Sequence, residues 1–88
     1  MIQKKYKIIE NNIEYNIREW EYDNKTKIKW WYHKRTLHRI NGPAVEWSNK
    51  FRYYWYLNGI RYPNKKKYYS ELLKRNLITK KEAFIELI

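Results

Sequence analysis

The chain has 88 residues, ten of them Tyr and five Trp, and a formal net charge of +11. It has no cysteine, which excludes disulfides and thiolate metal sites, and two histidines without an acidic cluster predict no metal and no other cofactor. A domain of this size buries only roughly 60–65% of the surface of its unfolded chain, so packing of the large aromatic residues must supply much of its stability.

Two strands joined by a tight turn are predicted at the start of the chain. Asn11-Asn12 separates "QKKYKIIE" from "IEYNI", and asparagine tolerates the left-handed backbone of a hairpin turn. Residues 13–17 alternate apolar with polar side chains, as in a half-buried strand. Trp20 and Tyr22 then fall on the opposite parity, so we expect a bulge or a break at residues 18–19.

Two further hairpins are predicted in the centre, one joining "REWEY" to "KTKIKWWY" and one joining "AVEW" to "FRYYWYL". The returning strand of the first hairpin divides into two faces, Lys25, Lys27, Lys29 and Trp31 against Thr26, Ile28, Trp30 and Tyr32. The returning strand of the second divides likewise, Phe51, Tyr53, Trp55 and Leu57 against Lys50, Arg52, Tyr54 and Tyr56. Asn58-Gly59 predicts another tight turn.

After Pro63 the pattern changes to two short helices. Asn64 is expected to cap a helix that places apolar residues at helical spacing, namely Tyr68 or Tyr69, Leu72 and Leu73. Thr79 and Glu82 have capping-box spacing and precede a second apolar set, Phe84, Leu87 and Ile88. Neither helix could persist alone in water, so we expect both to cover one face of the sheet.

These elements together predict the fold class. We expect one α+β domain over residues 1–88, with an antiparallel β meander of repeated hairpins over 1–62 and a cap of two short C-terminal helices over 63–88. The outer strands of such a meander have unpaired edges, which allows a homodimer.

The positive charge is concentrated in the middle of the chain. Residues 25–67 hold twelve Lys or Arg against one acid, Glu46, whereas residues 1–24 and 68–88 are nearly neutral. This distribution is typical of a surface for phosphate or another polyanion, and a merely solubilising surface is the alternative. The start of the chain, "MIQKKYKIIE", lacks the apolar run of a signal peptide, and no stretch is long enough for a membrane span. We therefore expect a cytoplasmic protein without membrane contact.

The two central hairpins are copies of one unit, since "EYDNKTKIKWWY" aligns with "EWSNKFRYYWY" at an offset of 25 and then 24 residues. The region around them resembles the tandem β-hairpin repeat proteins of phages and giant viruses, which carry a W-Y-x-N-G-x-L-H-R-x-D-G-P-A pattern and are MORN-like. The matching residues lie within 19–62 and are Trp31-Tyr32, Leu37-His38-Arg39, Asn41 to Ala44, Trp55-Tyr56 and Asn58-Gly59. The resemblance implies a hairpin array, often closed by a short C-terminal helix, in a viral or host-cell cytoplasmic setting.

The stretch "LHRINGPA" is interpreted as a structural turn of the repeat. Asn41-Gly42 supplies positive φ and Pro43 stiffens the exit, while Leu37 packs inward and His38 and Arg39 tie the turn to its neighbours. Two departures from the repeat pattern add cations. Lys34-Arg35 replaces Asn-Gly at a hairpin tip, and Lys65 to Lys67 open a helix whose N-terminus is already positive, which favours an anion there.

The favoured function is a non-enzymatic protein that captures a phosphate-bearing ligand, either nucleic acid or a nucleotide signal, on a basic and aromatic β face. Cations with interleaved rings are the usual means of holding single strands. At least three of the five Trp residues are nevertheless expected to be structural. The expected ligand-binding residues are Lys25, Lys27, Lys29, Trp31, Lys34, Arg35, Lys50, Arg52, Tyr54, Tyr56, Lys65, Lys66 and Lys67. In a viral setting such a protein could counter host defence, for instance CRISPR or nucleotide signalling.

Two other functions are compatible with the same residues. A protein-binding inhibitor would dock the same basic and aromatic face on an acidic or nucleic-acid-binding host protein. A small basic ribonuclease would use His33, His38 and Glu46 as acid–base groups, although the repeat pattern already assigns His38 a structural role.

Overall fold

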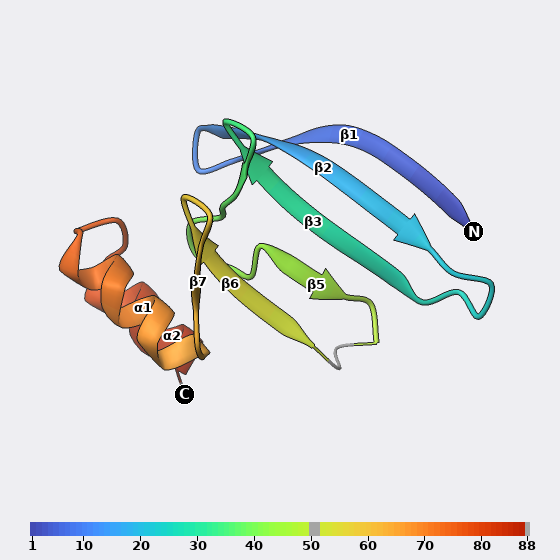
Figure 1. The fold of residues 1–88 in the computed structure, drawn as a ribbon. Helices are drawn as coiled ribbons and strands as arrows, with labels where there is room; N and C mark the ends of the chain where they lie inside the picture. The colour runs from blue at the N-terminus through green and yellow to red at the C-terminus, as the bar shows by residue number, and fades with distance from the viewer. Residues whose placement is uncertain (50–51, 88) are drawn as a thin grey trace.

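The computed structural model describes residues 1–49 and 52–87 of the chain. Within these residues an antiparallel meander is followed by two helices, as the sequence predicts (Figure 1). The strands and helices are β1 (Ile2–Glu10), β2 (Ile13–Glu21), β3 (Lys27–His33), β4 (Thr36–Leu37), β5 (Val45–Trp47), β6 (Tyr53–Leu57), β7 (Ile60–Tyr62), α1 (Lys65–Lys74) and α2 (Lys80–Leu87). The sheet order is β1-β2-β3-β5-β6-β7, and β4 pairs with β3 beside this path.

Tight turns join β1 to β2, β3 to β4, and β6 to β7. Asn11 and Asn12 have φ values of 53° and 64°, and Asn58 and Gly59 have 51° and 82°, so the two predicted turns are confirmed. Lys34-Arg35 forms the predicted hairpin tip between β3 and β4. At the β2–β3 turn the left-handed residue is Lys25 rather than the preceding Asp23-Asn24 pair.

The expected bulge at residues 18–19 is absent, and that prediction was wrong. β2 pairs without interruption with β1, from Glu10↔Ile13 to Ile2↔Glu21, and with β3 from Asn16 to Glu21. The apolar residues change parity along β2 because Trp20 lies on one face of the strand and Ile17 on the other. Trp20 meets Trp30 edge-on, with ring centroids 6.4 Å apart. β2 therefore carries apolar side chains on both faces.

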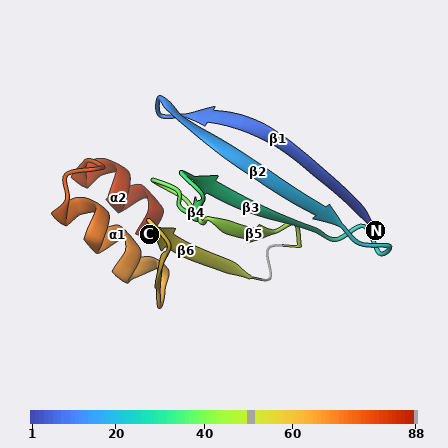
Figure 2. The ribbon, with the colours of Figure 1, turned by 45° about the horizontal axis from the view of Figure 1, so that its top comes forward.

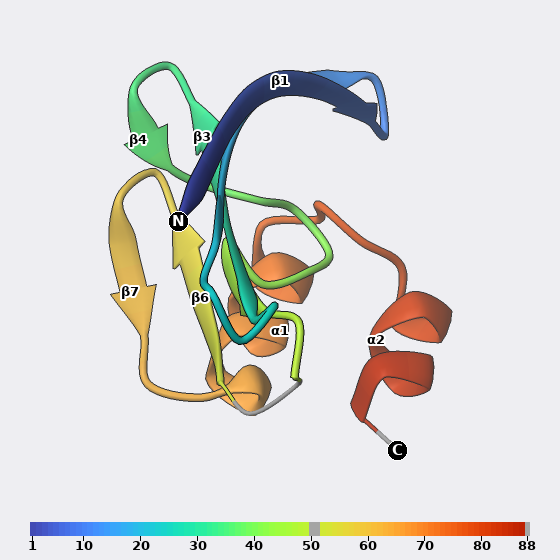
Figure 3. The same cartoon turned by 90° about the vertical axis from the view of Figure 1, so that its right-hand side faces the viewer.

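One hydrophobic core lies between β6, β7 and the helices. Tyr68, Tyr69 and Leu72 of α1 are buried against Leu57, with Trp55 packed beside them. α1 contacts β6 and β7, and α2 packs on α1. Both helices thus lie on one face of the sheet, at its β6–β7 end (Figures 1 and 3).

The two helix caps are as predicted, but the packing of α2 is not. The Asn64 side chain accepts a hydrogen bond from the Lys67 N–H (2.9 Å), and Thr79 and Glu82 cap each other's backbone N–H groups (3.0 and 3.1 Å). Of the described residues of α2 only Ala83 is buried, and Phe84 is 66% exposed. The expectation that Phe84 and Leu87 face the core was wrong, since the helix rests on its small residue; Ile88 lies outside the described residues.

A second core lies under the β1–β2 hairpin. It consists of Tyr15, Ile17, Trp31 and Ala44, with Leu37 packed against it. The turn between β1 and β2 and the two helices lie on the same side of the sheet, which makes that side concave (Figure 3). The helices and the N-terminus lie at opposite ends of the molecule (Figure 2). None of the described helices is long and apolar enough to cross a membrane.

Candidate nucleic-acid interface

The strand register sorts the charged and aromatic side chains onto two faces. Lys29 lies opposite Glu46, Trp30 lies opposite Val45, and Val45 lies opposite Tyr54. Residues directly opposite each other in antiparallel strands share a face. We call the face of Lys29 and Glu46, which also carries Trp55 and Leu57, the helix side. We call the other face the aromatic face. Its rings and arginines include Arg18, Trp20, Trp30, Tyr32, Trp47, Arg52, Tyr54 and Arg61; Arg52 is assigned to it because its guanidinium lies over the Trp47 ring.

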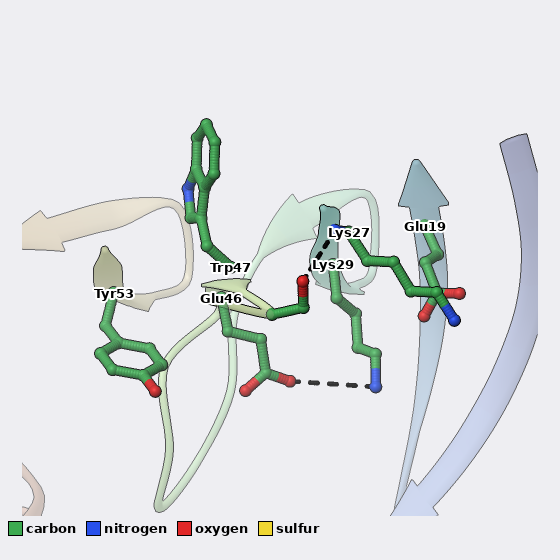
Figure 4. Close-up of a pocket in the computed structure, with 7 residues that line it drawn as sticks. Glu19, Lys27, Lys29, Glu46, Trp47 and Tyr53 are labelled. Atoms are coloured by element: carbon green, nitrogen blue, oxygen red, sulfur yellow. Dashed lines mark hydrogen bonds and ion pairs between the residues drawn. The ribbon is translucent and has the colours of Figure 1, made fainter. Parts of the chain in front are cut away.

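The helix side carries a cavity of about 400 Å³ between β2, β3, β5 and β6 (Figure 4). Tyr53, Glu46 and Lys29 point to the same side there, and Trp47 points away from them. The Lys29 Nζ lies 4.0 Å from Glu46 Oε1, and Lys27 lies opposite Glu21 in the strand register. The lining residues are Glu19, Lys27, Lys29, Glu46, Trp47, Ser48 and Tyr53.

Arg39 occupies the centre of the helix side. Its Nε and Nη2 donate to the two oxygens of Glu10 (3.1 and 3.0 Å), and its Nη1 donates to the Pro43 carbonyl (3.1 Å) and lies 3.6 Å from Glu46. Its Cζ lies 3.7 Å from the centre of the Trp31 ring. Trp31 is only 3% exposed and also donates through Nε1 to Glu46 (3.1 Å). A base could not stack on Trp31, so its expected place on an open binding face was wrong.

The "LHRINGPA" stretch is held by phenol groups from other elements. The Tyr68 hydroxyl donates to the Arg39 carbonyl and accepts from the Gly42 N–H (3.2 Å), and the Tyr69 hydroxyl donates to Asn41 Oδ1 (3.1 Å). Burial raises the pKa of Tyr68 from 10.0 to about 12, so this hydroxyl stays a donor well into the alkaline range. These contacts support the structural interpretation of the stretch.

Asn41 and Gly42 have different roles in the turn, although the sequence predicts positive φ for the pair. Asn41 has the positive φ, 68°, whereas Gly42 is needed for space. A Cβ on Gly42 would lie 2.7 Å from Arg39 Cζ.

His38 is also a structural residue. It is 6% exposed, and its Nδ1 accepts a hydrogen bond from the Asn58 N–H (2.9 Å). Burial lowers the pKa of His38, and the nearby His33 and Arg75 lower it further. The Glu46 carboxylate is likewise engaged by Trp31 and Arg39. The Nδ1 atom of His33, the third group of the ribonuclease hypothesis, lies 3.4 Å from the Glu14 carbonyl oxygen. All three groups therefore have other partners, and the described residues include no cluster that could hold a metal.

The aromatic face combines partly exposed rings with guanidinium groups. Arg61 Cζ lies 4.3 Å from the centre of the Tyr54 ring, and Arg18 Cζ lies 5.4 Å from that of Tyr32. Trp30 is partly exposed beside them. An open hollow of about 460 Å³ on this face is lined by Met1, Arg18, Trp20, Tyr22, Trp30 and Tyr32. Guanidinium groups over rings are geometrically suited to phosphate and base contacts.

The strand acids are distributed unequally between the faces. Four of them share the helix side, namely Glu10, Glu19, Glu21 and Glu46. On the aromatic face the described strands carry one acid, Glu14, and its Oε1 lies 3.6 Å from Lys7 Nζ. Lys5, Arg18 and Arg61 on that face have no strand acid beside them to offset their charge. The aromatic face is therefore the more positive of the two.

The predicted ligand-binding residues do not form one surface. Lys27 and Lys29 lie on the helix side, whereas Arg52 and Tyr54 belong to the aromatic face. Tyr56 lies opposite Arg61, on the aromatic face, but packs against the second core. Lys50 lies outside the described residues. The turns hold a third group, which consists of the exposed residues Lys25, Lys34 and Arg35.

The lysines at the start of α1 form a separate group. The Lys65 Nζ lies 3.6 Å from Glu86 Oε2 of α2, and Lys66 and Lys67 are exposed. Because α1 packs on the helix side, these residues do not extend the aromatic face. The expected anion site at this helix N-terminus stays a prediction.

Sequence reasoning missed six residues of the aromatic face: Arg18, Trp20, Trp30, Tyr32, Trp47 and Arg61. The sequence contains a signal for this face, because the apolar alternation changes parity after residue 17 and so places Trp20 on the face of β2 that does not carry Ile17. The change was interpreted as a bulge, although it marks a second apolar face on the same strand.

Comparisons with known proteins add no relative to this picture. No protein-family model, no curated protein and no solved structure matches the chain.

Proposed function

We propose that the protein binds single-stranded nucleic acid on the aromatic face, without catalysing a reaction. Bases would stack on the partly exposed rings of Trp30, Tyr32 and Tyr54, and phosphates would contact Arg18 and Arg61. The observation that carries the proposal is the arrangement of guanidinium groups over rings on a face with almost no carboxylate.

Single strands suit this surface better than duplexes do. Every base has an aromatic face that can stack on a side chain, but in a duplex those faces are already covered by neighbouring bases. Each base stacked on a protein ring contributes about 1–3 kcal/mol, and an arginine beside the ring adds a charge contact with the backbone. The helix side lacks this combination, because Trp31 is covered and its lysines have acids nearby.

The viral or host-cell cytoplasmic setting implied by the repeat pattern suggests a use for such binding. A small viral protein that holds single strands, or a nucleotide signal, could keep them from a host defence system. An acidic protein partner is the alternative ligand, since the same arginines could pair with carboxylates.

The test is a titration of a labelled single-stranded oligonucleotide of about ten nucleotides, within the site sizes usual for such domains. Trp30→Leu should weaken binding by about tenfold or more, as expected for one lost base stack. Arg61→Gln should lower the slope of log K against log salt by about 0.7. Lys27→Gln removes the same charge from the helix side and should leave both quantities nearly unchanged. Urea unfolding of each variant shows whether it is folded under the assay conditions.

Two results would overturn the proposal. One is equal loss of affinity in Lys27→Gln and Arg61→Gln with no loss in Trp30→Leu. The other is the absence of oligonucleotide binding by the native protein at low salt; if polyglutamate then binds, the face docks an acidic protein instead.

A further inference from the structure

Among the described residues, positive φ occurs in two groups of residue types. Nine described residues have positive φ, and six of them are asparagine or glycine, which tolerate this conformation. The other three are all cations: Lys25 (φ 68°), Lys34 (φ 49°) and Arg35 (φ 69°). All three are exposed.

The chain itself shows that cations are not required by these turns. Three turns place two consecutive residues at positive φ, and two of them use Asn11-Asn12 and Asn58-Gly59. The third uses Lys34-Arg35, and the Cβ atoms of these residues make a backbone of positive φ unfavourable. The Lys25 N–H donates to the Tyr22 carbonyl (2.8 Å) and so closes the turn between β2 and β3. Glycine is the usual residue at the position that Lys25 occupies in such a turn. Strain that local structure does not need often marks a functional position.

The strained cations lie at the two ends of one strand. β3 begins two residues after Lys25 and ends one residue before Lys34 (Figure 1). Its seven residues span about 23 Å at roughly 3.3 Å per residue. Trp30 and Tyr32 of the aromatic face lie on this strand, between the two turns.

We infer that a bound single strand runs along β3, with its backbone held at one end by Lys25 and at the other by Lys34 and Arg35. The inference rests on the proposed function and adds the path of the ligand. Bases stack on the middle of the path, and the cations at its ends contact phosphates beyond the stacked bases. A ligand of two or three nucleotides would therefore reach the rings without reaching both turns.

The experiment uses variants whose stability and affinity should change in opposite senses. Lys34→Asn with Arg35→Gly converts the turn to the residues that suit its backbone, and should raise Tm by roughly 5 °C or more. The same variant should weaken binding of a ten-nucleotide strand roughly tenfold and lower its salt slope by about 1.4, for two lost phosphate contacts. Lys25→Gly should act in the same way with about half the change in slope.

A matched control removes two exposed charges from α2. Lys80→Gln with Lys81→Gln should leave affinity and salt slope close to those of the native protein. A dinucleotide should bind the native and turn variants equally, because it does not span the path.

The outcomes separate this inference from the proposed function. If Trp30→Leu weakens binding while the turn variants bind the ten-nucleotide strand like the native protein, the path along β3 is wrong and the aromatic face still binds. If the α2 control loses as much affinity as the turn variants, the effect is general charge and the path is again wrong. Absence of oligonucleotide binding by the native protein overturns both.

Discussion

Replacing Arg39 should destabilise the protein more than replacing any exposed arginine. The guanidinium pairs through two nitrogens with Glu10, lies 3.6 Å from Glu46 and covers the Trp31 ring at 3.7 Å. Its side chain is 14% exposed, whereas those of Glu10 and Glu46 are 30% and 27% exposed. Arg39→Met leaves two partly buried carboxylates without their common partner.

The expected loss follows from these contacts. Removing one partner of a buried ion pair costs about 3–5 kcal/mol, and the partial exposure of both acids places this case near the lower end, at about 3 kcal/mol. For a domain of this size that loss lowers Tm by about 12 to 24 °C. Arg39→Lys keeps the charge but loses the two-nitrogen contact and the flat stack on Trp31, so its loss should be intermediate.

Urea unfolding followed by tryptophan fluorescence and circular dichroism gives the free energy of unfolding for each variant. Arg75→Met is the matched control, because Arg75 pairs with Glu71 one helical turn away (3.0 Å) and is 38% exposed. Its loss should be about 0.5 kcal/mol or less. A loss in Arg39→Met no larger than in Arg75→Met would refute the central role given to Arg39.

Two further changes probe the same region. Gly42→Ala should cost about 1–3 kcal/mol in urea unfolding, because the added Cβ would lie 2.7 Å from Arg39 Cζ, which Glu10 holds in place; native stability in this variant would contradict that contact. His38 should make stability depend on pH: its pKa is lowered from 6.5 in the folded protein by burial first, so the unfolded chain binds the proton before the folded one as the pH falls. The free energy of unfolding should then be constant above about pH 6.5 on account of this residue and decrease below it, and His38→Gln should flatten the dependence; an unchanged pH profile in that variant would exclude His38 as its source.

Local patterns predicted the fold well. Alternation, Asn11-Asn12, Asn58-Gly59 and the caps at Asn64 and Thr79 each depend on residues close together in the chain, and these elements are confirmed. The structure is consistent with the sequence alignment of the two central hairpins. The aligned residues Trp31 and Trp55 both pack into cores on the helix side.

The division of the site between two faces could not be read in the same way. It depends on the register between β3 and β5, two strands that are separated in the chain by β4 and a loop. Covering of Trp31 depends on Arg39, which is held by Glu10, a residue 29 positions away. For this reason the sequence prediction placed Lys27, Lys29 and Tyr54 on one binding surface, although the two lysines and Tyr54 lie on opposite faces of the sheet.

The most direct test of the binding face is photocrosslinking of a single strand containing 5-iodouracil, followed by peptide mapping of the attached residues. Our account predicts crosslinks to Trp30, Tyr32 or Tyr54 on the aromatic face, lost in high salt. Crosslinks confined to Tyr53 or Tyr6, which face the other side of the sheet, would contradict it.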